Sequence, residues 1–474
     1  MQVKREKARS WTVLVSVFLT LALIITGCGG GPNNSQSSNN SSTNESASEN
    51  ANASTPEENA SDAPPAEKVK IEFWANKFED TTDAWFKKWV DEFNKSRDDI
   101  EVKLTIVPGD AWAQKMKAAQ AAGKAPDLYT MNYGGIANAA KLQQILPLND
   151  LMDPSVFDDL YDNIKGFVAV GDKYYAYPKL VEPSTVLFYR KDLFQEAGLD
   201  PEQPPTTWAE MLEYGKKLTQ KGVFGLSIAQ NAVDLGWSSW GLQYNAAGHL
   251  PITDDWSKAD VMNDGYKALL NFYQQAYQSG IMPKQQLAAY ADAAPFGQGK
   301  TAMQVSGSWS IGLFRNSYKD MLDKIGVAPM ATIDGDQTKT TATLGGWTLV
   351  VDGKSKQPKE AAAFIQYLLA GDPNIMIDFF KTSQFSKFSA RKSVDEAMKS
   401  DPDASKDEWR ALIAEKIIPY SQAEPIYPWD ISMAFSTAIE SAMKGTSVDK
   451  ALEKADKDIN DIITKQKLAG TNPK

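Results

Sequence analysis

The amino-acid sequence predicts an α/β fold divided into two units. In two separate stretches, strand patterns of alternating apolar residues give way to helical patterns over short connections, the order expected of an α/β sheet. The 408 residues from 67 to 474 carry plentiful aromatic side chains and are enough for two domains. The first 66 residues differ in composition and are predicted to lie outside both units.

Residues 1–27 have the features of a secretory signal peptide. An uncharged run from Trp11 to Thr26 follows four basic residues and is somewhat short for a comfortable membrane span. Its end, Ile25-Thr26-Gly27-Cys28, resembles the bacterial lipobox, which implies that Cys28 is lipidated and begins the mature chain. Several acyl chains, such as palmitate, would then give stable anchoring. The alternative is an ordinary signal or anchor helix with an incidental cysteine.

Residues 28–66 are predicted to be a disordered linker rich in Ser and Asn. From Gly29 to Ala66 there is no Val, Ile, Leu, Met or aromatic residue, so the segment cannot bury enough apolar area to offset the entropy of ordering. As a flexible coil, a chain of this length separates its ends by about 35 Å on average. Such a linker would let a folded body stand just above a bilayer.

Composition excludes several classes of function. Cys28 is the only cysteine, so disulfides are absent from the predicted fold. His249 is the only histidine and has no partner residues in sequence for a metal, so triads that use histidine and zinc sites are not expected. The formal net charge of −10 argues against nucleic acid and against binding of anionic lipid by charge.

The first predicted unit alternates strands and helices from residue 69 onward. Phe86, Trp89, Val90 and Phe93 have the spacing of one helical face, so Trp85 and Trp89 are interpreted as core residues. Strands and an Ala-rich helix complete a parallel arrangement, whose ligands would lie at the carboxyl ends of the strands. The predicted strands are 69–74, 99–107 and 126–131, and the Ala-rich helix ends before Gly123.

The second predicted unit follows Pro178. Thr207 and Glu210 have the spacing of a capping box for a helix that carries Trp208. A turn of small residues, 306–308, joins a strand to a helix and places Trp309 at a sheet edge. The predicted strands are 186–190, 223–228, 301–305 and 342–351, and the predicted helices are 262–278, 430–444 and 449–466.

Several short motifs occur in an order that resembles one known family. They are the lipobox, Phe73-Trp74-Ala75, Ala125-Pro126-Asp127-Leu128-Tyr129, Tyr177-Pro178, Phe188-Tyr189-Arg190-Lys191-Asp192-Leu193-Phe194, Phe296-Gly297-Gln298-Gly299-Lys300-Thr301-Ala302-Met303, Ser306-Gly307-Ser308-Trp309 and Gly345-Gly346-Trp347. Each motif alone is weak, but together they resemble the extracellular solute-binding proteins of ABC sugar importers, the group that includes maltose-binding protein. The resemblance extends from residue 69 to the C-terminus.

The resemblance implies a two-lobe fold of the periplasmic-binding-protein type II class, with ligand in a cleft that closes by hinge bending. It places the N-lobe at 67–180 and 346–382 and the C-lobe at 181–345 and 383–474, with crossings near 177–187 and 343–347. It further implies a monomeric, non-enzymatic receptor without a cofactor. Such a receptor captures a carbohydrate and delivers it to ABC permease subunits from the outer face of a Gram-positive membrane.

Tryptophans are the strongest candidates for the site, because a sugar offers apolar C–H faces to flat rings. Trp309 and Trp429 lie among Gly, Ser and Pro residues, with no amphipathic stripe to join. The other candidates follow strand ends or flank a Ser pair, and core packing is about equally expected for each of them. These are Trp74, Trp237, Trp240 and Trp347.

Polar candidates would bind the sugar hydroxyls from the rim. Glu182 lies beside Pro183 in the first crossing, where an exposed surface glutamate is the equal alternative. Glu79 follows the first strand, although a helix start also favours acids. Maltose-binding protein has charged ligands after its first and third strands, whereas this chain has Trp74, Asn76, Asn132 and Tyr133, which leaves the preferred sugar open. Gly346 completes the candidate set.

Two other functions stay open at this point. A secreted glycosidase needs only two carboxylates, so the shortage of histidine does not exclude one, although no eightfold barrel pattern is present. A receptor of the same fold could instead take a peptide, a polyamine or glycerol phosphate. A phosphate would require Arg or Lys near the cleft, and the candidate residues include neither; a peptide is harder to exclude.

Overall fold

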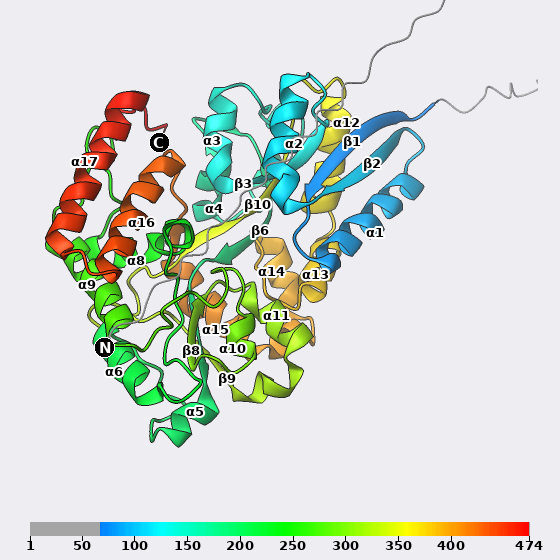
Figure 1. The fold of residues 1–474 in the computed structure, drawn as a ribbon. Helices are drawn as coiled ribbons and strands as arrows, with labels where there is room; N and C mark the ends of the chain where they lie inside the picture. Colours follow the sequence, from blue (N-terminus) through cyan, green and yellow to red (C-terminus); the bar gives the residue numbers. More distant parts are fainter. Residues whose placement is uncertain (1–66, 474) are drawn as a thin grey trace, which may run out of the picture. The chain divides into compact units, whose positions relative to one another are not determined.

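The computed structural model describes residues 67–473 (Figure 1). The predicted signal peptide, the linker and the lipidation site at Cys28 therefore lie outside the described residues. Within 67–473, no helix combines the length and the apolar character needed to cross a bilayer. The α/β prediction is confirmed, since helices and strands alternate through the chain.

A six-stranded mixed sheet forms the larger of the two main sheets. Its order is β11-β10-β3-β1-β2, and β6 also pairs with β10. β1 is parallel to β2 and to β3, whereas β10 is antiparallel to β3 and to β6. The strands are β1 (Val69–Asn76), β2 (Ile100–Val107), β3 (Leu128–Asn132), β6 (Tyr177–Pro183), β10 (Thr343–Val351) and β11 (Gln422–Ala423).

Alternation along β1 directs its side chains to the two faces of this sheet. Phe73 is fully buried and packs against Phe86 of α1 and Phe364 of α12, so these two helices cover one face. Trp74 points to the other face, where Lys115 of α2 lies 4.4 Å from its ring centroid. The helices around this sheet are α1 (Asp80–Ser96), α2 (Gly109–Ala121), α3 (Tyr133–Lys141), α12 (Pro358–Ile365) and α13 (Pro373–Thr382).

A three-stranded antiparallel sheet, β8-β7-β9, lies in the second part of the chain. Every residue of 186–189 in β7 is buried, and alternate residues join different hydrophobic clusters. Helices from distant parts of the sequence also belong to this region: α16 packs against α7, α9 and α17 (Figure 1). The elements are β7 (Val186–Arg190), β8 (Met303–Ser306), β9 (Ile325–Ala328), α7 (Ala232–Ser238), α9 (Asp264–Gln278), α16 (Trp429–Met443) and α17 (Val448–Gln466).

The remaining α-helices and strands are short. They are α4 (Asp162–Val168), β4 (Ala169–Val170), β5 (Lys173–Tyr174), α5 (Lys191–Glu196), α6 (Trp208–Leu218), α8 (Trp240–Ala247), α10 (Ala294–Gly297), α11 (Ser310–Ser317), α14 (Lys392–Lys399) and α15 (Glu408–Lys416). The predicted capping box of α6 is confirmed, because Thr207 and Glu210 bond reciprocally. Trp85 and Trp89 pack in one hydrophobic cluster, as their helical positions predicted, and Trp208 packs in the other.

One predicted strand, 223–228, is wrong as a regular strand. This segment forms only isolated bridges: Phe224 to Thr301 and Ser227 to Gln304 are parallel, and Val223 to Gln220 is antiparallel. Gly225 explains the irregularity, because a Cβ atom there would lie 1.9 Å from the carbonyl oxygen of Gly215. The close approach of α6 therefore bends the segment away from ladder geometry.

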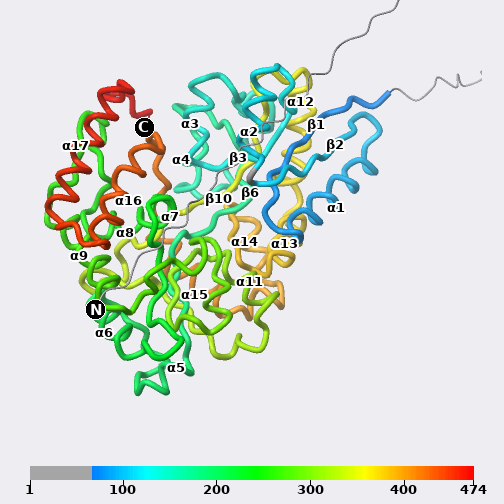
Figure 2. Tube along the Cα trace, in the orientation of Figure 1, coloured from blue at the N-terminus to red at the C-terminus, as the bar shows by residue number. Residues whose placement is uncertain are grey.

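The chain crosses between the two sheets where β6 leads into β7, and again at the start of β10; Figure 2 follows both crossings. The crossings are bonded to each other. The backbone N–H of Ser184 donates to the Thr343 carbonyl at 2.9 Å, and the Thr343 N–H donates to the Ser184 hydroxyl at 3.0 Å. Thr185 donates through its hydroxyl to the Thr341 carbonyl. These bonds tie the two crossings into one connection.

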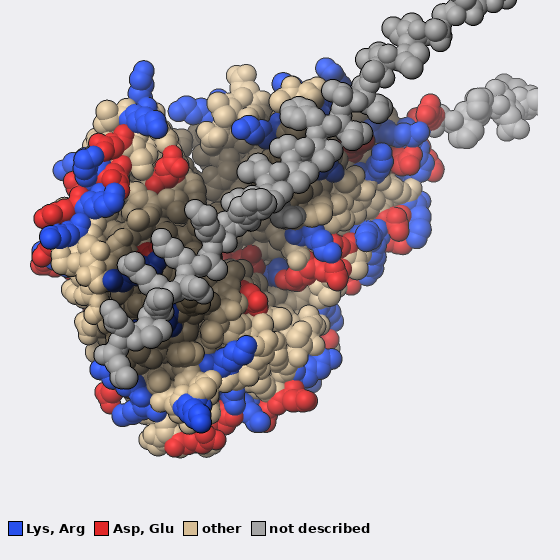
Figure 3. Space-filling model, in the orientation of Figure 1, with Lys and Arg blue, Asp and Glu red and all other residues tan. Residues whose placement is uncertain are grey.

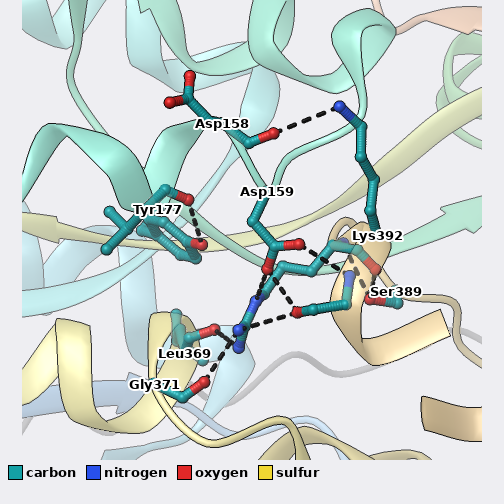
Figure 4. Close-up of polar contacts among 10 residues, drawn as sticks. Asp158, Asp159, Tyr177, Leu369, Gly371, Ser389 and Lys392 are labelled. Carbon is teal, nitrogen blue, oxygen red and sulfur yellow. Dashed lines mark hydrogen bonds and ion pairs between the residues drawn. The ribbon is translucent and has the colours of Figure 1, made fainter. Parts of the chain in front are cut away.

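An ion pair between Arg391 and Asp159 joins three segments of the larger sheet's region (Figure 4). Arg391 Nε donates to Asp159 at 2.7 Å, and its other nitrogens donate to the carbonyls of Leu369 and Gly371 at 2.8 and 2.9 Å. Ser393 also donates to Asp159 through its N–H and its hydroxyl. Together with the packing of α14 on α13, these bonds hold the start of the segment 383–474 against residues of the larger sheet's region. The lobe boundary drawn at 382 stays a prediction.

Charged side chains of both signs are interspersed over the face shown in Figure 3, including the surfaces of α1 and α17. Many form exposed pairs one helical turn apart, such as Lys457 with Asp461. Pairs of this kind contribute little to stability. This face of the described residues therefore shows no extended region of a single charge sign.

Candidate functional site

The candidate site begins at the edge where β1, β3 and β10 meet. β1 and β3 are parallel, so Asn76 and Asn132, their last residues, lie at the same sheet edge. β10 runs the other way and pairs Trp347 with Asn132. The first half of β10 thus reaches the carboxyl ends of the parallel strands, where an open α/β sheet places its ligand.

A cavity of about 830 Å³ lies at this edge. Residues of the larger sheet and its helices line this cavity, together with residues of the smaller sheet's region, among them Asp234, Tyr290 and Trp309. Its volume falls in the range of small-molecule sites. We call it the central cavity. Seven of the twelve candidate ligand residues line it: Asn76, Asn132, Glu182, Trp237, Trp309, Gly346 and Trp347.

Aromatic rings form much of the wall of the central cavity. The ring of Trp309 meets Tyr290 edge-on with centroids 5.4 Å apart, and its indole N–H donates to the Ala291 carbonyl at 3.1 Å. Gly307 lies directly beneath that indole, because a Cβ atom there would come within 2.0 Å of the ring. Trp347 is braced by Phe78 at 4.4 Å. These contacts fix the rings before any ligand arrives.

A second cavity of about 520 Å³ adjoins the first. Both are lined by Asn132, Gly135, Asn138, Trp237 and Glu424, so they share a boundary. Trp240 and Trp429, two further candidates, line only the second cavity. We call it the tryptophan cavity.

The three tryptophans pack on one another. The centroids of Trp237 and Trp429 are 4.4 Å apart at an interplanar angle of 30°, and Trp240 donates through its indole N–H to the Ser432 hydroxyl at 3.0 Å. Gly236 allows this packing, since a Cβ atom there would lie 2.6 Å from Trp429. Trp237 keeps 41% of its surface exposed, which is high for a large aromatic side chain.

Three candidate residues line neither the central cavity nor the tryptophan cavity. Trp74 packs beneath Lys115 on the face covered by α2. Glu79 pairs with Lys387 at 2.9 Å. Tyr133 is buried and donates its hydroxyl to the Leu180 carbonyl at 2.9 Å. The alternation of β1 and the depth of α3 in the core direct these side chains elsewhere, so any role for them in binding would be indirect.

Glu424 lines both cavities but was not among the site residues predicted from the sequence. Its carboxyl group lies against Gly345, where a Cβ atom would come within 2.3 Å of Glu424 Oε1. Gly345 is the register partner of Glu182 across the β6–β10 ladder. Burial, and secondly the nearby Glu182, raises the pKa of Glu424 to about 8. Burial also raises the pKa of Glu182.

A signal for Glu424 exists in the sequence. Glu182-Pro183 and Glu424-Pro425 are the same dipeptide, and a proline holds the residue before it in an extended conformation. The other missed residues include Trp112 and Tyr290. Trp112 lies with Met116 on a stripe of α2 that a core interpretation would also explain. Tyr290 is a large ring in a loop of alanines.

Gly346 lies at the junction of β10, β6 and α3. Its φ of +147° is outside the range that other residues adopt, and a Cβ atom there would lie 2.3 Å from the Leu180 carbonyl oxygen and 2.9 Å from the Tyr133 ring. Trp347 lies directly before a register shift in the same ladder, which falls between Trp347 and Thr348. Gly346 therefore lets the crossing strands approach closely and positions Trp347.

A buried lysine lies behind Glu182 on β6. Lys179 is 2% exposed, and its ammonium group lies 4.9–5.1 Å from the ring centroids of Phe78, Phe86 and Phe379. Burial, and secondly the charge of Lys387, lowers the pKa of Lys179 to about 7. Three acids oppose that shift and partly hold the proton: Glu182, Glu79 and Asp83.

Lys179 should make stability fall on acidification from pH 10 to pH 7. The unfolded chain holds this proton up to a pKa near 10.5, whereas the native protein releases it from about 7, so protonation favours unfolding in this window. The free energy of unfolding of the wild type should fall by up to about 1.4 kcal/mol per pH unit relative to Lys179→Met. Urea unfolding at several pH values measures this difference. Parallel curves for the two proteins would contradict it.

The comparisons with known proteins agree on the fold. A model of the family described as bacterial extracellular solute-binding protein matches residues 79–372, more than half of the chain. A solute-binding protein of Thermotoga lettingae TMO, solved with alpha-D-tagatose, superposes with a TM-score of 0.71 at 23% identity, covering 84% of this chain and 100% of that one. The cyclic alpha-maltosyl-1,6-maltose binding protein of Arthrobacter globiformis gives 0.70 at 24% identity, with coverage of 84% and 100%.

Curated relatives carry a different ligand in their names. The sn-glycerol-3-phosphate-binding periplasmic protein UgpB of Pectobacterium atrosepticum is 28% identical over 304 residues, which are 59% of this chain and 64% of that protein. UgpB of Yersinia pestis is 29% identical over 304 residues, which are 59% of this chain and 65% of that protein. The chain thus spans somewhat less than two thirds of these relatives. The structural similarity and the match to the family model together assign a fold and a family. The class of ligand must be inferred from the residues that line the cavity.

Proposed function

The chain belongs to the bacterial extracellular solute-binding protein family, and from this membership we propose that it is the carbohydrate receptor of an ABC importer. The receptor captures a sugar in the central cavity and delivers it unchanged to permease subunits. Ligand stabilises the closed form by its greater affinity for closed over open, and the permease reads closure.

The observation that carries this proposal is the chemistry of the central cavity. Indole rings from three separate segments, Trp237, Trp309 and Trp347, line it together with amide and carboxylate groups. Flat rings suit the C–H faces of a pyranose, and amides and carboxylates suit its rim of hydroxyls. The combination supports a sugar over a purely apolar solute.

The charge of the lining argues against the ligand in the names of the curated relatives. None of the residues that line the central cavity is a lysine or an arginine, and three of them are acids: Glu182, Asp234 and Glu424. A phosphate ester carries negative charge, which the three acids would repel and which no lysine or arginine of the lining would balance. Glycerol phosphate is therefore a poor match for this cavity.

The size of the site favours an oligosaccharide. The central cavity and the tryptophan cavity adjoin through shared lining residues and together exceed what one sugar ring needs. A ring bound against Trp309 or Trp347 could continue toward Trp237 and Trp429. We infer that additional sugar units contact the tryptophan cavity.

The proposal includes the membrane attachment that the lipobox implies. Lipid on Cys28 would hold the receptor at the outer face of a Gram-positive membrane, with residues 28–66 as the connection to the folded part. Mass spectrometry of the native protein tests this directly: an acylated Cys28 at the N-terminus is expected. Retention of residues 1–27 would contradict it.

A thermal-shift and calorimetric screen tests the ligand class. Mono- and oligosaccharides, glycerol 3-phosphate and short peptides are each added to the purified protein. A true ligand at about 100 times its Kd stabilises the native state by about 2.7 kcal/mol, so the melting temperature should rise clearly with a sugar. Recovery of that sugar intact by chromatography distinguishes a receptor from a glycosidase. A shift with glycerol 3-phosphate or peptide alone would contradict the proposal.

A further inference from the structure

We propose that the sugar bound in the central cavity carries a free, protonated amino group, and that Glu424 is its counter-ion. This inference rests on the proposed carbohydrate function and specifies the class of sugar. It comes from the charges of the cavity, from acceptors that lack donors, and from the aromatic wall.

Glu424 differs from the other two acids in having no compensating donor or cation. Asp234 accepts hydrogen bonds from the side chains of Asn231 and Gln286 and from the Tyr290 N–H at 3.0 Å. Glu182 experiences the favourable charges of Lys387 and Lys179.

Glu424 forms no hydrogen bond or ion pair with any residue of 67–473, and the charged residue that acts on it is Glu182, another acid. Lys141, a lysine that lines the tryptophan cavity, is exposed on α3. The structure thus holds a half-buried carboxyl group whose ionised form lacks a partner. A cation that enters with the ligand would remove this cost.

Other unpaired groups at the cavity are also acceptors. Asn76 is 8% exposed and lines the cavity, and its side-chain oxygen Oδ1 has no donor. Glu182 Oε2 is likewise buried without a donor. An ammonium group has three N–H donors and no acceptor, whereas a hydroxyl has one donor. These unpaired acceptors fit an amine better than a hydroxyl.

The aromatic wall favours the same charge. The faces of Trp309, Trp347 and Trp237 carry negative electrostatic potential and attract a nearby cation. An anionic ligand would meet both these faces and the acids. Three features of the lining thus favour a cationic ligand over an anionic one: the carboxylates, the aromatic faces, and the lack of lysine and arginine.

Sets of sugars that differ only at C2 test the proposal. Each set holds the same sugar with a hydroxyl, an N-acetyl group or a free amine at C2, as in glucose, N-acetylglucosamine and glucosamine, and in their β-1,4 dimers and trimers. Galactose-based sets are included. Calorimetry at pH 7, where an amine of this kind is largely protonated, gives the Kd of each member. In the sets that bind, the free amine should bind at least about tenfold more tightly than either neutral form.

Glu424→Gln tests the assigned counter-ion. This substitution keeps the size of the side chain and removes its charge, so the preference for the amine over the N-acetyl form should fall to within about threefold. Asp260→Asn, a change of the same kind at an exposed acid that lines neither cavity, is the control and should keep the full preference. Circular dichroism and thermal unfolding confirm that each variant is folded.

The outcomes separate this inference from the proposed function. If neutral sugars bind as tightly as their amines, the inference is overturned and the carbohydrate receptor stands. An amine preference that survives Glu424→Gln also overturns the assignment to Glu424. If no sugar in any form binds, the inference and the carbohydrate proposal fail together. A strong amine preference that Glu424→Gln abolishes supports both.

Discussion

Trp309→Ala should weaken sugar binding by roughly thirtyfold or more, about 2 kcal/mol. The indole lies flat on Gly307, is anchored by its bond to Ala291, and meets Tyr290 at a wall of the central cavity. Its contacts hold it ready for a sugar face, and alanine would leave that face exposed to water. Calorimetry with the sugar identified by the screen measures the change in Kd.

Trp74→Ala is the matched control for this experiment. Trp74 was also a candidate in the sequence, with core packing about equally expected, but it packs beneath Lys115 and lines neither cavity. Its removal should change the Kd by less than about threefold, although it costs some stability. If Trp309→Ala bound sugar as well as the wild type while remaining folded, Trp309 would not belong to the site. A loss with Trp74→Ala alone would place the ligand elsewhere.

Asp159→Asn should lower the free energy of unfolding by about 3–5 kcal/mol. Arg391 has 6% of its side chain exposed and would keep its charge without a carboxylate partner. Arg391 also bonds to the carbonyls of Leu369 and Gly371, so loss of its carboxylate partner would loosen three segments together. Urea unfolding followed by circular dichroism measures the change.

Asp162→Asn provides the control for Asp159→Asn. Asp162 lies at the start of α4, is 87% exposed and pairs with Lys165 at 3.2 Å. Its loss should cost no more than about 0.5 kcal/mol. An equal, small effect of both substitutions would show that the Arg391–Asp159 pair is not a stabilising connection.

Acidification should reproduce the loss at Asp159 in the wild type. Hydrogen bonds from Ser393 and the charge of Arg391 lower the pKa of Asp159 despite its burial. The stability that this group contributes is therefore present above the unfolded pKa of about 3.8 and is lost as the pH falls through the lower native value. The difference in stability between wild type and Asp159→Asn should shrink below pH 4.

Local patterns in the sequence determined most of the fold. Alternation predicted β1 and β2, helical spacing predicted α1, and the spacing of Thr207 and Glu210 predicted the start of α6. These signals succeed because they depend on residues within one or two turns of each other. The segment 223–228 failed for the opposite reason, since the backbone of α6 at Gly215 decides its geometry.

Only the tertiary structure decided which of the candidate residues line the central cavity. Trp74 and Trp347 both lie in strands with equal claims in sequence, yet the direction of each strand and the face that α2 covers bring only Trp347 to the cavity. Glu424 reaches it because Gly345, 79 positions earlier, has no side chain in the way. A sequence read locally shows which residues can bind a sugar, but long-range packing decides which of them meet, because side-chain direction depends on partners far away in the chain.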